Sequence, residues 1–192
     1  MTNTADPREY YARALAQTES IVAAVRPGQL GDPTPCPEYD VRALLSHIVA
    51  GVKRTAVVGE GGDISATPVM VDGVPDDGWQ AAYQTASARA TAVWADDARL
   101  DAMVTVPWGT MPGRAALSGY VQEILMHGWD LATATGQQTE LDSELATWTL
   151  ALARRILPPE PRGGDIPFGP VVPAGAGAGV YAQLAGWLGR KQ

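Results

Sequence analysis

One stretch constrains the fold more than any other: residues 116–136, which read ALSGYVQEILMHGWDLATATG. Apolar side chains recur there at the spacing of one face of an α-helix, and Gly136 follows as a helix stop. We therefore predict one long helix over 116–136 with one face against a core. The apolar face comprises Leu117, Val121, Ile124, Leu125 and Leu131.

A second stripe runs beside the apolar face and consists of Tyr120, Glu123, His127 and Asp130. Glu123 and His127 are one helical turn apart, so their side chains project from the same face. A carboxylate and an imidazole placed in this way can share one divalent metal ion. The same spacing is also typical of ordinary pairs on solvated helix faces, and the pair alone leaves both interpretations open.

His47 occupies a similar place in an earlier helix. Asp40 is a candidate N-cap for a helix over 41–59, and His47 lies at the edge of its apolar stripe. Packing the two helices by their apolar stripes would bring His47 and His127 toward a common cleft. The alternative for His47 is a half-buried histidine bonded to a backbone carbonyl.

The rest of the chain predicts further helices separated by loops. Asp6 and Pro7 open a first helix that ends before Pro27-Gly28, a third spans 77–99, a fifth spans 142–157, and a short last one spans 180–191. Residues 101–114 break the pattern as a small hairpin, and residues 59–76 form a long loop. The expected fold is all-α: one domain over 1–192, an up-and-down four-helix bundle with an irregular hairpin insert and short C-terminal helices.

Composition narrows the class of protein. The chain has 192 residues, 46% of them hydrophobic and 18% charged, as in globular proteins. Its net charge is −7 and it has no Lys/Arg cluster, so a nucleic-acid partner is not expected. It has no apolar run of membrane-spanning length and no signal-peptide pattern, so we expect a cytoplasmic protein without a membrane partner.

Two segments resemble a known family. TPCPEYDVRALLSHIVAG (34–51) and EILMHGWDLATATG (123–136) are similar to helices of the DinB-like superfamily and, more narrowly, of the mycothiol-dependent maleylpyruvate isomerase N-terminal domain family. The tail, 166–191, resembles the ending of small actinobacterial members. This resemblance implies a bundle that holds a divalent metal, usually zinc, through His47, Glu123 and His127. Nickel, iron and manganese also suit such ligands.

Other residues have two interpretations each. Asp130, one turn beyond His127, either orients that ligand from outside the coordination sphere or is an ordinary exposed aspartate. Cys36 is the only cysteine, so an internal disulfide is excluded, and its position across a proline-rich turn from His47 argues against its being a ligand. The aromatic residues either line a pocket or belong to the core; they are Trp108, Tyr120 and Trp129.

Three protein ligands would leave an open coordination position for water or a small molecule. The resemblance implies metal-dependent transfer or isomerisation of a small electrophile with a low-molecular-weight thiol of the mycothiol type. The rival hypotheses are a non-catalytic metal-binding or stress-response bundle and, less favoured, a bundle with no metal. The expected partners are that substrate or thiol, with a homodimer also compatible.

Overall fold

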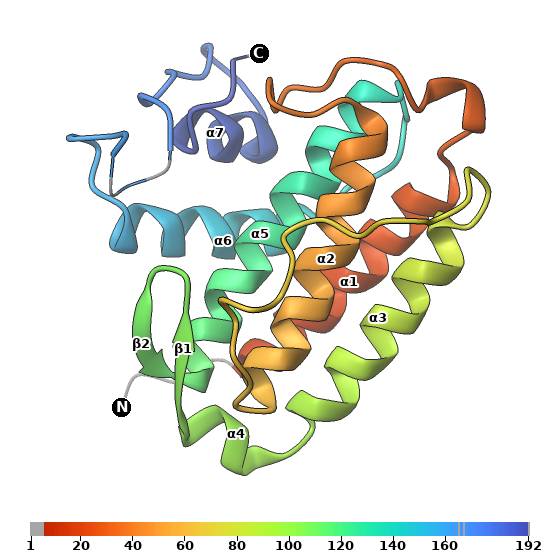
Figure 1. Ribbon diagram of the computed structural model, residues 1–192. Coiled ribbons are helices and arrows are strands. Elements are labelled where there is room, and N and C mark those ends of the chain that lie inside the picture. Colours follow the sequence, from red (N-terminus) through yellow and green to blue (C-terminus); the bar gives the residue numbers. More distant parts are fainter. Residues whose placement is uncertain (1–5, 165, 167, 192) are drawn as a thin grey trace.

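Four long helices lie side by side in the computed structural model, which describes residues 6–164, 166 and 168–191. They are α1 (Pro7–Ala23), α2 (Val41–Gly59), α3 (Trp79–Trp94) and α5 (Gly113–Ala134). Helices α1 and α2 each pack against both α3 and α5, so the four form a closed ring (Figure 1). The predicted all-α four-helix bundle is confirmed.

Smaller elements surround the bundle. A 3-10 turn, η1 (Pro27–Gln29), follows α1, and α4 (Asp97–Asp101) leads into an antiparallel hairpin of β1 (Met103–Val106) and β2 (Gly109–Pro112). Near the C-terminal end of the chain, α6 (Ser143–Ile156) packs mainly against α7 (Val180–Trp187), beside the bundle (Figure 1). No helix in the described ranges is both long enough and apolar enough to cross a membrane.

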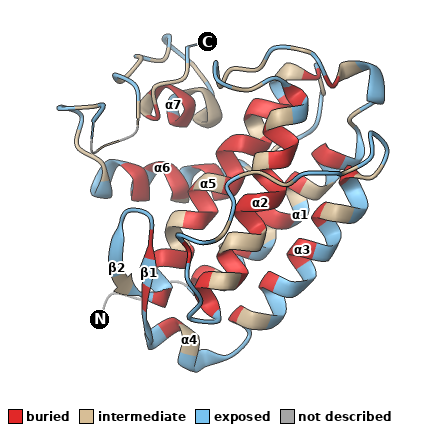
Figure 2. Cartoon of the chain, viewed as in Figure 1, coloured by how far each residue is buried: buried red, intermediate tan, exposed pale blue. Residues whose placement is uncertain are grey.

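The core is richest along α2 and α5, whereas α3 leaves one face exposed (Figure 2). Burying a leucine or isoleucine contributes about 1.5–3 kcal/mol each, so this helix pair is firmly held. Side chains placed on α2 and α5 therefore start from a rigid scaffold. The fully buried apolar residues of the pair include Leu44, Leu45, Ile48, Leu117, Ile124, Leu125 and Leu131.

Helix boundaries follow local hydrogen bonding. The carboxylate of Asp40 accepts from the backbone N–H of Ala43 and begins α2 as predicted. Gly136, with a φ of +65°, reverses the chain after α5, also as predicted. Asp142 accepts from the N–H of Leu145 and begins α6.

Two predicted helices are wrong in extent. The helix expected over 77–99 is two helices, because the carboxylate of Asp96 accepts from the N–H of Ala98 and begins α4 instead of continuing α3. The last helix stops at Trp187 rather than at 191, because Gly189 has a φ of +82° and turns the chain. The turn at Gly189 directs the residue that follows it, Arg190, back toward α5.

Candidate metal centre

Helices α2 and α5 bring His47, Glu123 and His127 together. Each side chain offers one ligand atom, and these atoms all lie within 4.8 Å of one another. Oε1 of Glu123 lies 3.2 Å from Nε2 of His47 and 3.7 Å from Nε2 of His127. The two imidazole rings meet edge to face, with their centroids 4.9 Å apart. The histidines of two helices thus share one cleft with the carboxylate.

This arrangement fits a divalent metal ion. Tetrahedral zinc with bonds of about 2.0–2.1 Å holds its ligand atoms about 3.3 Å apart, close to the two distances from Glu123. Two imidazoles and a carboxylate suit zinc and also nickel, iron or manganese. Within the described part of the chain, no fourth Cys, His, Asp or Glu belongs to the cluster, and Cys36 lies outside it.

The imidazole of His47 is fixed from a loop. Its Nδ1 lies 3.0 Å from the carbonyl oxygen of Val69, and a carbonyl can only accept, so Nδ1–H is the donor. This bond leaves Nε2 facing Glu123. Tyr39 lies against the same ring, with centroids 5.1 Å apart. The two interpretations of His47 therefore coexist, because the ring is bonded to a backbone carbonyl and also belongs to the cluster.

The imidazole of His127 has a different neighbour. Its Nδ1 lies 3.3 Å from Oδ2 of Asp130, although the two are not aligned as a hydrogen bond. Asp130 is fully buried, so the alternative of an exposed aspartate is wrong. Its carboxylate accepts instead from the guanidinium of Arg190, with Nη2 2.9 Å from Oδ2.

Charge stabilises the ionised carboxylate at the centre. Burial favours the neutral form of Glu123, but the hydrogen bond from His47 and the nearby charges of His127 and Arg190 outweigh it and lower its pKa to about 2. With 35% of its side chain exposed, water shares in stabilising this anion. Burial also opposes the charged form of His47, but the bond to Glu123 dominates and raises the pKa of the imidazole.

Glu123 also marks the open side of the cluster. Its side chain is 35% exposed, against 18% for His47 and 11% for His127. The histidines are enclosed by the protein, so an exogenous ligand would approach past the carboxylate. A cluster of three ligands with one accessible side can accept a further ligand.

The loop after α2 is tied across this region by three side chains of that helix (Figure 1). The hydroxyl of Ser46 donates to the carbonyl of Val71 at 2.7 Å, and the N–H of Val71 donates back at 2.8 Å. The guanidinium of Arg54 donates to the carbonyls of Ile64 and Thr67. The bond from His47 to Val69 lies between these two anchors in the sequence of the loop.

Sequence reasoning missed Arg190 and Val69. Arg190 lies 60 positions beyond its partner Asp130, and nothing in a helical pattern links residues at that distance. Val69 contributes only a backbone carbonyl, which no side-chain pattern reveals. The glycine before Arg190 was a usable sign, because a glycine after a short helix predicts a reversal of the chain.

The structure places the three aromatic residues and Cys36 in different environments. Tyr120 is core at 3% exposure, and its hydroxyl has no partner among the described residues, while Trp108 beside it is half exposed. Trp129 is partly buried against the core. Cys36 is partly buried, and burial raises the pKa of its thiol despite the nearby charge of Arg190, which fits an unreactive packed cysteine.

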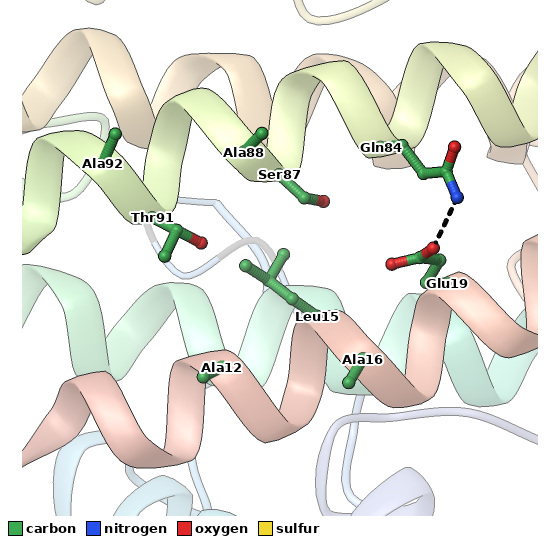
Figure 3. Close-up of a pocket in the computed structure, with 9 residues that line it drawn as sticks. All are labelled: Ala12, Leu15, Ala16, Glu19, Gln84, Ser87, Ala88, Thr91 and Ala92. Atoms are coloured by element: carbon green, nitrogen blue, oxygen red, sulfur yellow. Dashed lines mark hydrogen bonds between the residues drawn. The ribbon is translucent and has the colours of Figure 1, made fainter.

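A surface groove of about 480 Å³ lies elsewhere, between α1 and α3 (Figure 3). Small side chains such as Ala16 and Ala88 line it, and Gln84 donates to Glu19 at its edge at 2.7 Å. Since α1 and α3 form the side of the ring opposite α2 and α5, the groove is separate from the metal cluster.

Comparison with known proteins connects this site to a family. The sequence model of the Mycothiol maleylpyruvate isomerase N-terminal domain matches residues 11–132. Two uncharacterized proteins from strains of Mycobacterium tuberculosis are each 37% identical over 185 residues, which span 96% of this chain and 98% of theirs.

A solved structure has the same fold. The crystal structure of the mycothiol-dependent maleylpyruvate isomerase superposes with a TM-score of 0.59 at 16% identity, over 76% of this chain and 66% of that one. A mutant of the same enzyme gives a TM-score of 0.54. The matched part is thus slightly under two thirds of the isomerase. The family match spans more than half of the 192 residues, so the chain belongs to the Mycothiol maleylpyruvate isomerase N-terminal domain family.

Proposed function

We propose that this protein binds one divalent metal ion, most simply zinc, and uses it in a reaction between a low-molecular-weight thiol and a small electrophile. The ligands are Nε2 of His47, the carboxylate of Glu123 and Nε2 of His127. The observation that carries this proposal is the convergence of the three ligand atoms within 4.8 Å. The thiol class, mycothiol, follows from the name of the related isomerase.

The chain's own residues prepare the site for such a reaction. His47 and His127 are held with Nε2 toward Glu123, and three protein ligands leave a coordination position free. Zinc bound there would lower the pKa of a thiol or water in that position toward neutrality. The exposed side of Glu123 gives a small molecule access, while the loop after α2 holds the imidazole of His47 through the carbonyl of Val69.

The proposed chemistry has two forms that an assay can separate. In both, the thiol sulfur forms a bond to an electrophilic carbon of a multiple bond, and the π electron pair of that bond moves onto the substrate, which takes up the proton that the thiol gives up. In an isomerisation that bond breaks again, so the thiol is regenerated with the rearranged product. In a transfer the adduct is the product, so one thiol is consumed for each electrophile.

The first test is the metal content of the purified protein by elemental analysis, followed by titration with zinc. We expect one metal per chain, with His127→Ala losing most of it and Cys36→Ser retaining it. A wild-type protein that binds no divalent metal at micromolar concentration would refute the proposal.

The second test is turnover by the metal-loaded protein, with mycothiol and maleylpyruvate as the first pair. Free thiol and product are followed together, so that regeneration and consumption of thiol are distinguished. His127→Ala serves as the metal-free control. Metal binding without turnover of any thiol and electrophile pair would favour the non-catalytic metal-binding bundle.

A further inference from the structure

Arg190 reaches the metal cluster from the far end of the described chain. Its Nη2 lies 2.9 Å from Oδ2 of Asp130, and its Nε lies 3.3 Å from the same oxygen. The same Oδ2 is 3.3 Å from Nδ1 of His127. One carboxylate oxygen therefore faces both a guanidinium and the imidazole of a proposed ligand. The Arg190 side chain is 13% exposed, and that of Asp130 is 0% exposed.

Local backbone structure aims Arg190 at this point. At the end of α7, the N–H of Arg190 donates to the carbonyl of Ala185 at 2.9 Å, and the N–H of Gly189 donates to Gly186 at 3.1 Å. This pair of bonds, with φ of +82° at Gly189, is the Schellman motif that ends many helices. A Cβ on Gly189 would lie 2.8 Å from the backbone of Gly169, so only glycine fits the turn.

We propose that Arg190 is a positioning residue of the metal centre, which holds the Asp130 carboxylate where it can accept from Nδ1–H of His127 and so keep Nε2 toward the metal. This inference rests on the proposed function, because it assigns a role within the same site. The family match ends at residue 132, so Arg190 lies outside the part of the chain that the family describes.

The carboxylate of Asp130 can select the tautomer of His127 through the hydrogen bonds it is able to accept. A carboxylate paired with arginine can only accept, so a hydrogen bond between it and His127 requires the proton to be on Nδ1. When Nδ1 carries the proton, the lone pair of the neutral ring is on Nε2, the atom that lies 3.7 Å from Glu123. Removing a carboxylate that orients a histidine ligand in this way typically weakens metal affinity by about 10- to 100-fold.

Arg190 is needed because Asp130 is fully buried. A buried carboxylate without a cation is strongly disfavoured, and none of the lysines or other arginines of the described residues is bonded to this one. The competing explanation is purely structural: the ion pair would only attach α7 to α5. The two explanations differ in their effect on metal affinity once the protein is folded.

The experiment measures the zinc dissociation constant of folded protein by competition with a chromophoric chelator. Arg190→Met is expected to weaken zinc binding by about 10- to 100-fold, and Arg190→Lys by less, because lysine keeps the charge but not the paired contacts. The matched control is Arg154→Met, since Arg154 lies 5.7 Å from the ring of Trp187 in α7 and is not bonded to Asp130. That control should bind zinc as the wild type does.

A double-mutant cycle tests whether Arg190 affects zinc affinity through Asp130. If Arg190 acts through Asp130, Arg190→Met should cause little further loss of affinity in an Asp130→Asn background. Wild-type affinity in both Arg190 variants, or an equal loss in the Asp130→Asn background, would overturn the inference. If Arg190→Met does not fold, Arg190→Lys with and without Asp130→Asn decides. A wild type that binds no zinc would instead refute the proposed function itself.

Discussion

The two histidines of the cluster are held in contrasting ways. Nδ1 of His47 bonds a backbone carbonyl of a loop, whereas Nδ1 of His127 faces a buried carboxylate fixed by an arginine. The first support is neutral and belongs to a segment tied down by a few hydrogen bonds. The second is charged and lies between α5 and the end of α7. The difference teaches that His47 is positioned by a surface loop, whereas His127 is positioned by the packing of α5 against the end of α7.

The largest expected effect comes from removing either of the two histidines proposed as metal ligands. His47→Ala and His127→Ala should each weaken zinc binding by more than about 100-fold, beyond the range of changes outside the coordination sphere. Competition with a chromophoric chelator measures this. If both histidines bind the metal, both variants should lose a similar amount of zinc affinity. Retention of metal by His47→Ala would restrict the site to residues of α5.

Asp130→Asn should disrupt the support of His127 and leave the support of His47 by the loop in place. It leaves the Arg190 charge buried without its partner, which costs about 3–5 kcal/mol of unfolding free energy. Urea denaturation of the metal-free protein measures this loss. In Asp130→Asn combined with Arg190→Met neither charge remains, so the loss should be smaller than the sum of the two single losses. Simple addition would show that the pair is not coupled.

Ser46→Ala tests the loop support and should have a milder effect. It removes the two bonds to Val71 and should cost about 0.5–1.5 kcal/mol for each bond. Limited proteolysis should show faster cleavage within 60–78, and metal binding should slow that cleavage because His47 links the loop to the site. An unchanged cleavage rate in the variant would mean that His47 and Arg54 suffice to hold the loop.

The smallest expected effect is a pH dependence with opposite signs in the two forms. The pKa of His47 is raised in the folded metal-free protein, so its contribution to stability is present below about 6.5 and is lost as pH rises through the raised pKa. Zinc competes with the same proton, so zinc affinity should increase over that window. Melting temperatures measured with and without zinc from about pH 6 to about pH 9 give the slope against pH for each form. Parallel slopes would contradict the assignment of His47.

Below pH 4.5, the dependence of protein stability on pH should come from Glu123. Its pKa is lowered to about 2, so its contribution to the stability of the folded protein is present above the ordinary pKa of 4.5 and is lost as pH falls toward 2. Glu123→Gln serves as the control, because it keeps the shape but does not titrate. The difference between the two melting profiles below pH 4.5 should therefore shrink as the pH falls.

Sequence reasoning captured what depends on local spacing. The 3.6-residue period placed Glu123 and His127 on one face, and Asp40 marked the first turn of the helix that carries His47. The family resemblance then joined the three residues into one ligand set, and the structure brings them within 4.8 Å.

The supports outside the ligand set were harder to predict, for physical reasons. The bond from His47 to Val69 depends on the course of a loop, and a backbone carbonyl has no sequence signature. The contact of Arg190 with Asp130 depends on how α7 packs, which periodicity within one helix does not specify. The break between α3 and α4 was missed because alanine-rich sequence favours a helix on either side of Asp96, and one side-chain bond decided the boundary.

The distance in sequence between Asp130 and Arg190 has a consequence for the order of folding. Helix α5 is synthesised 60 residues before the cation that its aspartate requires. If the surroundings of α5 closed before Arg190 was available, Asp130 would be enclosed with no counter-charge, which is a costly intermediate. We therefore expect the C-terminal end of α5 to stay open until α7 docks. The docking of α7, which is synthesised after α5, would then enclose Asp130 and align His127 in a single step.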